Sequence, residues 1–410
     1  MWKYPWGFKE GYVISAGLFI TGILLQIIIG PFMADILQFP VNITAGIIFI
    51  ILLIVLHLLS AHRRIIRWFS GMEASITSIS SFLILVIIMG LIRQHSGTET
   101  DGTVLGAIGF THMLAAWPFV LLFIYLETVL GLVILRRLKH FNWKKDIPFT
   151  LNHLGLFTAL FAGVLGGADM QRLQMVIGKE IPEWRATNDK NEVIELPIAL
   201  ELNQFSIDEY PPKLMIIDNK TGETLPRNQP ASVLIEKTPV TVNLQGWTLK
   251  VTKLLENSAP VIATDSVRYV AYYSDGATAA VFVEAMNPKT KEKAKGWVSC
   301  GSYTFPYNAL TLNTKFSLVM PDREPKRYYS DVNVYTKRGK SFRTVIEVNK
   351  PLTIDGWKIY QTGYDEQKGK WSDVSQLELV KDPWLWLVYT GIIMMMCGAV
   401  CLFVFAKKKE

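Results

Sequence analysis

Cysteine and histidine are scarce in this chain of 410 residues, and their positions limit its chemistry. Cys397 and Cys401 lie in the C-terminal apolar run, so Cys300 is alone in the segment 168–381, which therefore has no internal disulfide. That segment also has no histidine, which excludes a Ser-His-Asp triad and most zinc sites there. We interpret Cys300 as a small buried residue of a strand at Trp297–Tyr303, with a redox thiol as the alternative.

A cleavable signal peptide is also not evident. The first apolar run is too long for the apolar segment of a signal peptide and no small-residue cleavage site follows, so we expect it to remain as an anchor. A helix rises about 1.5 Å per residue, so about twenty residues cross a hydrocarbon core of about 30 Å. The sequence therefore predicts six membrane-spanning helices, built on the apolar runs Gly11–Ile29, Val41–Leu59, Phe82–Ile92, Met113–Leu135, Leu151–Gly167 and Leu385–Phe405.

The net charge of +7 does not indicate a nucleic-acid partner, because the basic residues cluster beside apolar runs. The clusters lie at His62–Arg67, at Arg136–Lys145 and at Lys407–Lys409. Positive clusters beside spans stay in the cytoplasm. Six spans with both termini in the cytoplasm satisfy all three clusters and place the segment 168–381 on the other side of the membrane.

The third span, about Glu73–Ile92, differs from the others in its first half. Residues Ala74–Ser81 are small and polar. Such residues suit close packing between helices better than exposure to lipid. We therefore expect this half of the span to face neighbouring helices.

The long hydrophilic segment has the pattern of a β-rich domain. Its short β-like runs are separated by turn-forming residues, for example Asp218–Gly222 and Lys337–Lys340. Evenly spaced short strands are typical of a sandwich or a barrel-like fold. The predicted architecture is an α-helical transmembrane bundle of six spans (five at 1–167 and one at 382–410) with a large extracytoplasmic all-β domain at 168–381. Strands are expected at Val193–Leu200, Leu214–Ile217, Val240–Leu244, Trp247–Leu254, Val267–Tyr273, Ala279–Met286, Trp297–Tyr303, Phe316–Met320, Val332–Thr336, Phe342–Val348, Leu352–Tyr360 and Val374–Val380.

Ionisable side chains inside the spans are candidates for function, because they are costly to bury in a membrane. His57, Glu127 and His153 are expected at a shared depth near the inner leaflet, whereas His112 lies near the outer end of the fourth span. An unpaired buried carboxylate costs several kcal/mol, so we expect Glu127 to have a polar partner, His153 or His57.

The fifth span has two distinct faces. Gly155, Ala159 and Gly163 form a small-residue stripe, with Asn152 beside it, which suits close packing against another helix. His153 lies on a different face with Phe157, Leu160 and Val164. An imidazole above a flat apolar wall meets the needs of a porphyrin. The alternative is that His153 forms only a hydrogen bond to a neighbouring helix.

Two segments carry a family resemblance. The first runs from Leu151-Asn152-His153-Leu154-Gly155 through Gly166-Gly167-Ala168-Asp169 to Leu173. The second is Asp355-Gly356-Trp357-Lys358-Ile359-Tyr360-Gln361-Thr362-Gly363-Tyr364-Asp365, followed by Lys381-Asp382-Pro383-Trp384. Together they resemble the ResB/CcsB family of the system II cytochrome c maturation pathway, whose members also combine several spans, a large external β-domain and a final span. The resemblance covers the chain from the fifth span onward, and the five leading spans depart from the family's usual three.

The resemblance implies a bacterial inner-membrane protein that works with a CcsA/ResC-type subunit. Such pairs move haem outward for attachment to the two cysteines of a CXXCH motif in apocytochrome c, with thiol-reducing proteins as further partners. The tryptophan-rich motif of the partner (WGxxWxWD) is missing from this sequence, so the chain is expected to be the B-type half. We expect haem b to be bound in transit, with His153 as an axial ligand of the iron and Asn152, Phe157, Glu127 and His57 nearby.

Two other classes of protein remain open. A b-haem or quinone oxidoreductase subunit would need two facing histidines, for which His57 and His153 qualify. A membrane scaffold or transporter permease would bind partners and no haem.

Overall fold

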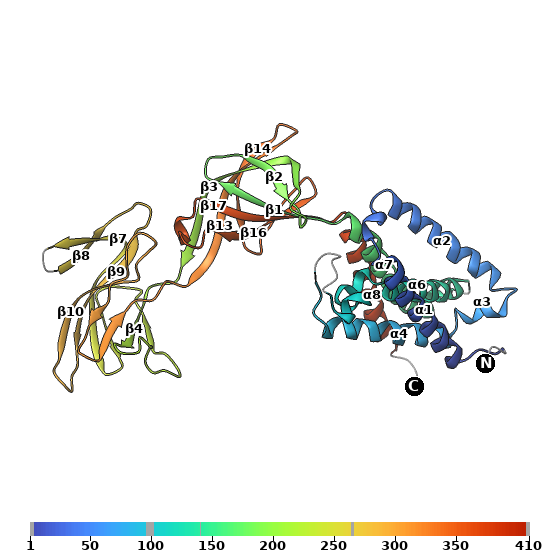
Figure 1. The fold of residues 1–410 in the computed structure, drawn as a ribbon, viewed down its shortest axis with the longest axis horizontal. Helices are drawn as coiled ribbons and strands as arrows, with labels where there is room; N and C mark the ends of the chain where they lie inside the picture. The colour runs from blue at the N-terminus through green and yellow to red at the C-terminus, as the bar shows by residue number, and fades with distance from the viewer. Residues whose placement is uncertain (1–3, 96–101, 140, 264–265, 407–410) are drawn as a thin grey trace. The chain divides into compact units, whose positions relative to one another are not determined.

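The computed structural model describes residues 4–95, 102–139, 141–263 and 266–406, and the chain divides into two compact units (Figure 1). A helical unit contains Met1–Met170 and Asp382–Glu410, and a β unit contains Gln171–Lys381. The β unit begins at Gln171 rather than at the expected residue 168. The basic cluster Lys407–Lys409, which we used for the topology, lies outside the described residues.

Six helices in the described part of the chain are long and apolar enough to cross a membrane, as the sequence predicted. The helix α6 begins with Pro118 in its first turn, where a missing backbone N–H costs nothing. Shorter helical segments connect the long ones: η1 (Ala34–Leu37), α3 (Arg64–Trp68), α5 (Val104–Ala107), η2 (Phe110–Ala115) and η3 (Gly167–Asp169). The long helices are α1 (Phe8–Ile29), α2 (Val41–Leu59), α4 (Met72–Leu91), α6 (Trp117–Leu138), α7 (Trp143–Gly166) and α8 (Leu385–Ala406).

The helix α6 is the centre of the helical unit. Its apolar window is 67% buried, compared with 11–22% for the other long helices. It packs against α1, α2, α4 and α7. The polar half of α4 turns inward, since Thr77 and Ser78 are fully buried. A Cβ added to Gly11 of α1 would lie 2.4 Å from the Thr77 hydroxyl oxygen, so the expected close packing of this half is confirmed.

The helices α7 and α8 are in backbone contact through small residues. A Cβ at Gly155 would lie 2.6 Å from the carbonyl oxygen of Gly391, and a Cβ at Gly391 would lie 2.6 Å from the backbone nitrogen of Ala159. The packing role of the stripe is therefore confirmed for Gly155 and Ala159. It is wrong for Gly163, which is exposed and where an added Cβ would meet no described residue outside its own helix turn within 4 Å.

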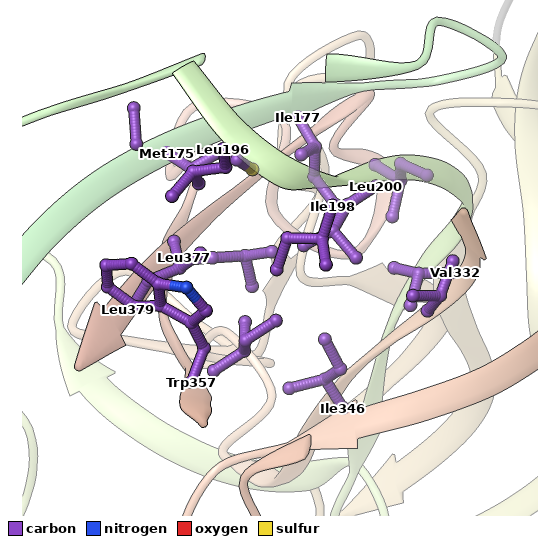
Figure 2. Close-up of a cluster of buried hydrophobic side chains, with 14 of the residues drawn as sticks. Met175, Ile177, Leu196, Ile198, Leu200, Val332, Ile346, Trp357, Leu377 and Leu379 are labelled. Carbon is purple, nitrogen blue, oxygen red and sulfur yellow. The ribbon is translucent and has the colours of Figure 1, made fainter. Parts of the chain in front are cut away.

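The first part of the β unit is one sheet that encloses its own core. The strand order is β14-β13-β3-β2-β1-β17-β16-β15, and β14 also contacts β16, so the sheet curls round. Figure 2 shows side chains of this core, including Met175, Ile198 and Trp357, directed into the interior of the curled sheet. The strands are β1 (Gln171–Gly178), β2 (Glu183–Thr187), β3 (Val193–Glu209), β13 (Pro325–Thr336), β14 (Ser341–Glu347), β15 (Leu352–Ile354), β16 (Trp357–Tyr364) and β17 (Val374–Lys381).

The second part of the β unit has two sheets around a separate core. The sheet β10-β9-β7-β6, to which β8 is added beside β7, packs against the sheet β11-β12-β4-β5 through residues such as Leu214, Leu249, Val281 and Leu318. The expected large β-domain is present, but it has two hydrophobic cores. The strands are β4 (Lys213–Asp218), β5 (Ser232–Leu234), β6 (Val240–Leu244), β7 (Trp247–Ala263), β8 (Ser266–Ala271), β9 (Thr278–Met286), β10 (Lys293–Ser299), β11 (Leu310–Thr311) and β12 (Phe316–Val319).

Two predicted strands need correction. The run Leu352–Tyr360 is a hairpin of β15 and β16, because Asp355 (φ 47°) and Gly356 (φ 83°) both have left-handed backbone angles and make a two-residue turn. The strand expected at Trp297–Tyr303 ends at Ser299, so Cys300 lies beyond it. The strands β1 and β2 were not predicted, although Leu173, Met175 and Ile177 alternate with exposed residues along β1.

Candidate functional site

His153 lies in the first half of α7 and is partly buried. Its Nδ1 is 2.9 Å from the carbonyl oxygen of Phe149, one turn earlier. A carbonyl only accepts hydrogen bonds, so Nδ1 carries a proton, and in the neutral imidazole Nε2 then carries the free lone pair. The described residues form no hydrogen bond to Nε2. This tautomer is the one that can bind a metal ion through Nε2.

A cation and two rings are stacked at this end of α7. The imidazole of His153 stacks on the ring of Phe149 with centroids 3.8 Å apart, and the guanidinium of Arg137 lies 5.3 Å from the centroid of the same ring. Asp146 holds Arg137, accepting a hydrogen bond of 2.7 Å from its Nε. Arg137, which belongs to a basic cluster that we used to predict the orientation in the membrane, is thus held against Phe149, the ring on which His153 stacks.

The apolar side chains expected beside His153 do not form one continuous wall, because some are buried between helices and others are exposed. Phe157 is only 7% exposed and packs against Leu53 of α2 and near Gly131 of α6. It also stacks on Phe161, with centroids 5.3 Å apart. Val164, by contrast, is 43% exposed. Phe157 therefore closes the space between α6 and α7 one turn above the histidine.

Glu127 does not have the partner that we predicted. It is 1% exposed, and neither carboxylate oxygen forms a hydrogen bond to any described residue. Gly131, one turn further along α6, is level with Phe157 of α7. The two helices are joined by a short connection and run in opposite directions, so Glu127 and His153 are separated by about two turns, roughly 11 Å along the axes. The aromatic ring of Phe157 lies at the level between them.

The remaining predicted residues occupy separate places. Asn152 donates from Nδ2 to the carbonyl oxygen of Pro148 (2.9 Å) and faces Gly398 of α8, so it lies at the α7–α8 contact. His57 is partly exposed near the end of α2, and its ring has no partner among the described residues. No described group of three or more His, Cys, Asp or Glu side chains lies close enough to hold a metal ion.

A polar cluster that the sequence analysis missed joins the two motif segments. The carboxylate of Asp169 accepts hydrogen bonds from Trp384 Nε1 (2.8 Å), from Asn42 Nδ2 (2.7 Å) and from the backbone N–H of Phe39 (2.7 Å). Gly166 leaves the space for the Trp384 side chain, since a Cβ there would clash with Trp384 Cβ and with Cγ of its indole. Trp384, the last residue of the second motif segment, thus fastens α8 to the end of α7. The sequence signal that could have predicted this cluster is Asp169 itself, an acidic residue just after the apolar run Leu151–Gly167.

The β unit contains a cleft of about 580 Å³. Aromatic side chains line it, among them Tyr303, Tyr307, Tyr364 and Trp371. Three acidic and three basic side chains line it, and several of them are paired: Arg323 Nη1 with Glu256 (2.6 Å) and Glu209 (3.5 Å), and Lys370 Nζ with Glu209 (3.2 Å). A cleft with balanced, partly paired charges and aromatic walls suits an uncharged surface better than a strongly charged one.

Cys300 lines this cleft instead of a strand interior. Its sulfur is 3.4 Å from the Thr278 hydroxyl oxygen, and the residue is partly buried. The interpretation of Cys300 as a buried strand residue is therefore wrong in its position. Its chemical role stays a prediction.

Residues 304–372 match the model of the ResB-like family, which is consistent with a ResB/CcsB family protein. The matched region includes much of the lining of the cleft and the Asp355–Asp365 motif, but it excludes His153 and its motif. The comparison with curated proteins returns no match. The family match indicates a role in cytochrome c biogenesis, and together with the apolar helices it indicates a membrane protein.

Proposed function

We propose that this chain, with its ResB-like region, is the B-type subunit of a system II cytochrome c biogenesis complex. In this proposal it helps to move haem across the bacterial inner membrane and presents haem or apocytochrome c to a CcsA/ResC-type partner. The partner then completes thioether attachment at CXXCH. The observation that carries the proposal is the tautomer of His153, whose Nδ1–H is held by Phe149 while Nε2 is left as a donor for iron.

Haem is the cargo in this scheme, and His153 supplies one axial nitrogen to it. The surroundings of the imidazole are apolar on the side of Phe149 and Phe157, as a porphyrin requires. We place the second axial ligand on the partner subunit, because the interactions of the His153 ring with described residues are with Phe149 and not with another histidine. Phe157 separates the imidazole from Glu127, so Glu127 would contact the cargo only after the ring moves.

The cleft of the β unit is the proposed place for apocytochrome c. Its aromatic lining and paired charges suit an extended, weakly charged segment, and the family match overlaps it. The thiols of the client must stay reduced there, which is why thiol-reducing proteins are included as partners.

The test is a haem spectrum of the chain purified together with its partner. We expect His153→Ala to lose most of the bound haem and added imidazole to restore a part of it, because free imidazole can replace the missing ligand. His57→Ala is the matched control, since it removes a histidine from another span and should keep haem content near that of the wild type.

Two outcomes would overturn the assignment. Full haem content in His153→Ala, with no effect of imidazole, excludes His153 as a ligand. Loss of haem in His57→Ala alone would move the site to α2 and support an electron-carrying b-haem subunit.

The orientation in the membrane is proposed from the basic clusters. Both termini are cytoplasmic and the β unit is extracytoplasmic. Reporter fusions after Leu59 and after Lys409 should report the cytoplasm, and fusions within 171–381 should report the outside. A cytoplasmic signal from the β unit would contradict the orientation.

A further inference from the structure

Arg137, in the last turn of α6, lies beside the proposed haem ligand and has no role yet in the proposed function. Its guanidinium carbon is 5.3 Å from the centroid of the Phe149 ring, and that centroid is 3.8 Å from the centroid of the His153 imidazole. Since the two distances share the Phe149 centroid, the guanidinium and the imidazole are at most about 9 Å apart. A fixed positive charge therefore lies within one side-chain length of the proposed iron ligand.

Asp146 fixes the orientation of this guanidinium and leaves part of it open. The carboxylate of Asp146 is buried and accepts a hydrogen bond of 2.7 Å from Arg137 Nε, and the same oxygen is paired with Nη2. Its other oxygen accepts from the backbone N–H of Asn142 (2.7 Å), which holds the carboxylate in place. Arg137 Nη1 forms no hydrogen bond to a described residue, and the side chain is 51% exposed. The Nη1 edge of the guanidinium is therefore accessible to a second anion.

The cargo of the proposed function carries anions of the right kind. Haem has two propionate carboxylates, and a carboxylate that enters an apolar region without a partner is strongly destabilised. A guanidinium binds a carboxylate by charge-assisted hydrogen bonds. A propionate carboxylate lies roughly 7 Å from the iron, and a hydrogen bond adds about 3 Å, so a guanidinium within about 9 Å of an axial imidazole is within its reach.

We propose that Arg137 binds a propionate of the haem held by His153, and that Asp146 positions Arg137 for this contact. The inference rests on the proposed haem function and adds a specificity to it, because the site then selects tetrapyrroles with a free propionate carboxylate. The adjacent Arg136 is not equivalent, since its Nη1 donates to the carbonyl oxygen of Ser70 (3.0 Å).

The experiment compares two ligands on the chain purified with its partner subunit in detergent and without haem. The complex is titrated with haemin and with haemin dimethyl ester, whose propionates carry no charge, and binding is followed by absorption. We expect the wild type to bind haemin at least about ten-fold more tightly than the ester. Arg137→Gln should remove most of this preference and leave the affinity for the ester unchanged, because the ester cannot form the charged contact. Arg137→Lys should keep part of the preference, and Asp146→Asn should reduce it, because Arg137 loses the group that orients it.

The control for net charge is Lys139→Gln, which removes one positive charge from an exposed side chain two residues further along. It should keep the wild-type preference. The proposal is overturned if the wild type binds both compounds equally, if Arg137→Gln keeps the full preference, or if Lys139→Gln loses as much as Arg137→Gln. Arg137→Lys and Asp146→Asn decide the matter if Arg137→Gln does not accumulate, since an undiminished preference in both would also overturn it.

His153→Ala separates this proposal from the function on which it rests. If His153→Ala binds haemin as the wild type does, the haem site itself is wrong. If His153→Ala loses haemin while Arg137→Gln still prefers haemin to the ester, the haem site stands and only the propionate contact is wrong.

Discussion

The two units differ in how they treat buried polar side chains. In the β unit, Gln361 accepts hydrogen bonds at Oε1 from Ser330 (2.6 Å) and Ser375 (2.8 Å), and its Nε2 donates to the Gly363 carbonyl (2.7 Å). Within the described ranges, every buried side-chain nitrogen or oxygen without a partner belongs to the helical unit: Ser15 Oγ, Trp68 Nε1, His112 Nε2, Tyr125 Oη, both carboxylate oxygens of Glu127 and Thr150 Oγ1.

This difference shows which unit supplies hydrogen-bond partners for its own buried polar side chains. The β unit satisfies its polar groups by its own fold, as a stable domain in water must. The helical unit is closely packed, through glycine contacts and a buried central helix. Only some of its buried polar side chains have hydrogen-bond partners among the described residues. Groups of that kind are expected in a subunit that handles a cargo and contacts other subunits within the membrane.

The largest loss of stability is expected from disrupting the close packing of α7 against α8 in the helical unit. In Gly155→Leu the new side chain would meet the backbone of Gly391, so α7 and α8 must separate. We expect a loss of about 3 kcal/mol or more, seen as a lower thermal midpoint or as failure to accumulate in the membrane. Gly163→Leu on the same helix is the control and should be nearly neutral, because that position is open. Equal effects of the two changes would contradict the packing argument.

The next effect tests the polar network of the β unit. Gln361→Leu leaves Ser330 and Ser375 without their shared acceptor in a buried site, and we expect a cost of about 1–3 kcal/mol. Denaturant unfolding followed by tryptophan fluorescence measures it. Thr362→Val, on the exposed face of the same strand, should change the free energy of unfolding by less than about 0.5 kcal/mol. A neutral Gln361→Leu would show that the network adds no stability.

A smaller, pH-dependent effect is expected at the surface of the β unit. The hydrogen bond from Arg343 lowers the pKa of Asp331, with a further contribution from Asn203. A lowered pKa in the folded state stabilises the protein above the unfolded value, near pH 4, and this stabilisation is lost as the pH falls through the folded pKa. Asp331→Asn should therefore cost about 0.5–1 kcal/mol at neutral pH, since Arg343 is largely exposed, and less at about pH 3, where part of the stabilisation is already lost.

The control for this pH effect is Asp189→Asn, which changes an exposed carboxylate in a loop. Its free energy of unfolding should follow that of the wild type across the same pH range. A cost of Asp331→Asn that is the same at both pH values would mean that the ion pair is not its cause.

The smallest effect on stability is expected at Glu127, although its position in a span suggested a functional, paired carboxylate. Glu127 forms no hydrogen bond to any described residue, so Glu127→Gln should leave the thermal midpoint of the chain unchanged or raise it slightly, because an amide is less costly to bury than a charge. Asn42→Leu is the contrast within the same unit. It removes a donor to Asp169 and to the Leu165 carbonyl and should lower the midpoint clearly. A drop in Glu127→Gln as large as that in Asn42→Leu would show that Glu127 has a partner.

The sequence alone determined the features that depend on local pattern. Six apolar runs of sufficient length define the helices, and the period of Gly155 and Ala159 defines a contact face, because each depends on residues close together in the chain. The turn at Asp355-Gly356 is equally local, but we predicted one continuous strand there, and the structure corrected it. The inward orientation of the polar half of α4 was equally readable, since small polar residues are poor lipid contacts.

Only the tertiary structure decided which distant residues meet. Asp169 binds the indole of Trp384 across 215 positions, and the pair of histidines that came together is His95 with His112, not His57 with His153. From their positions in the spans, Glu127 and His153 were predicted to lie at the same depth. The antiparallel packing of α6 and α7 instead places Phe157 at a level between them. The pattern of a sequence specifies which face of a helix is buried, but not its height against a neighbour, because that height depends on loop lengths and on the packing of whole helices.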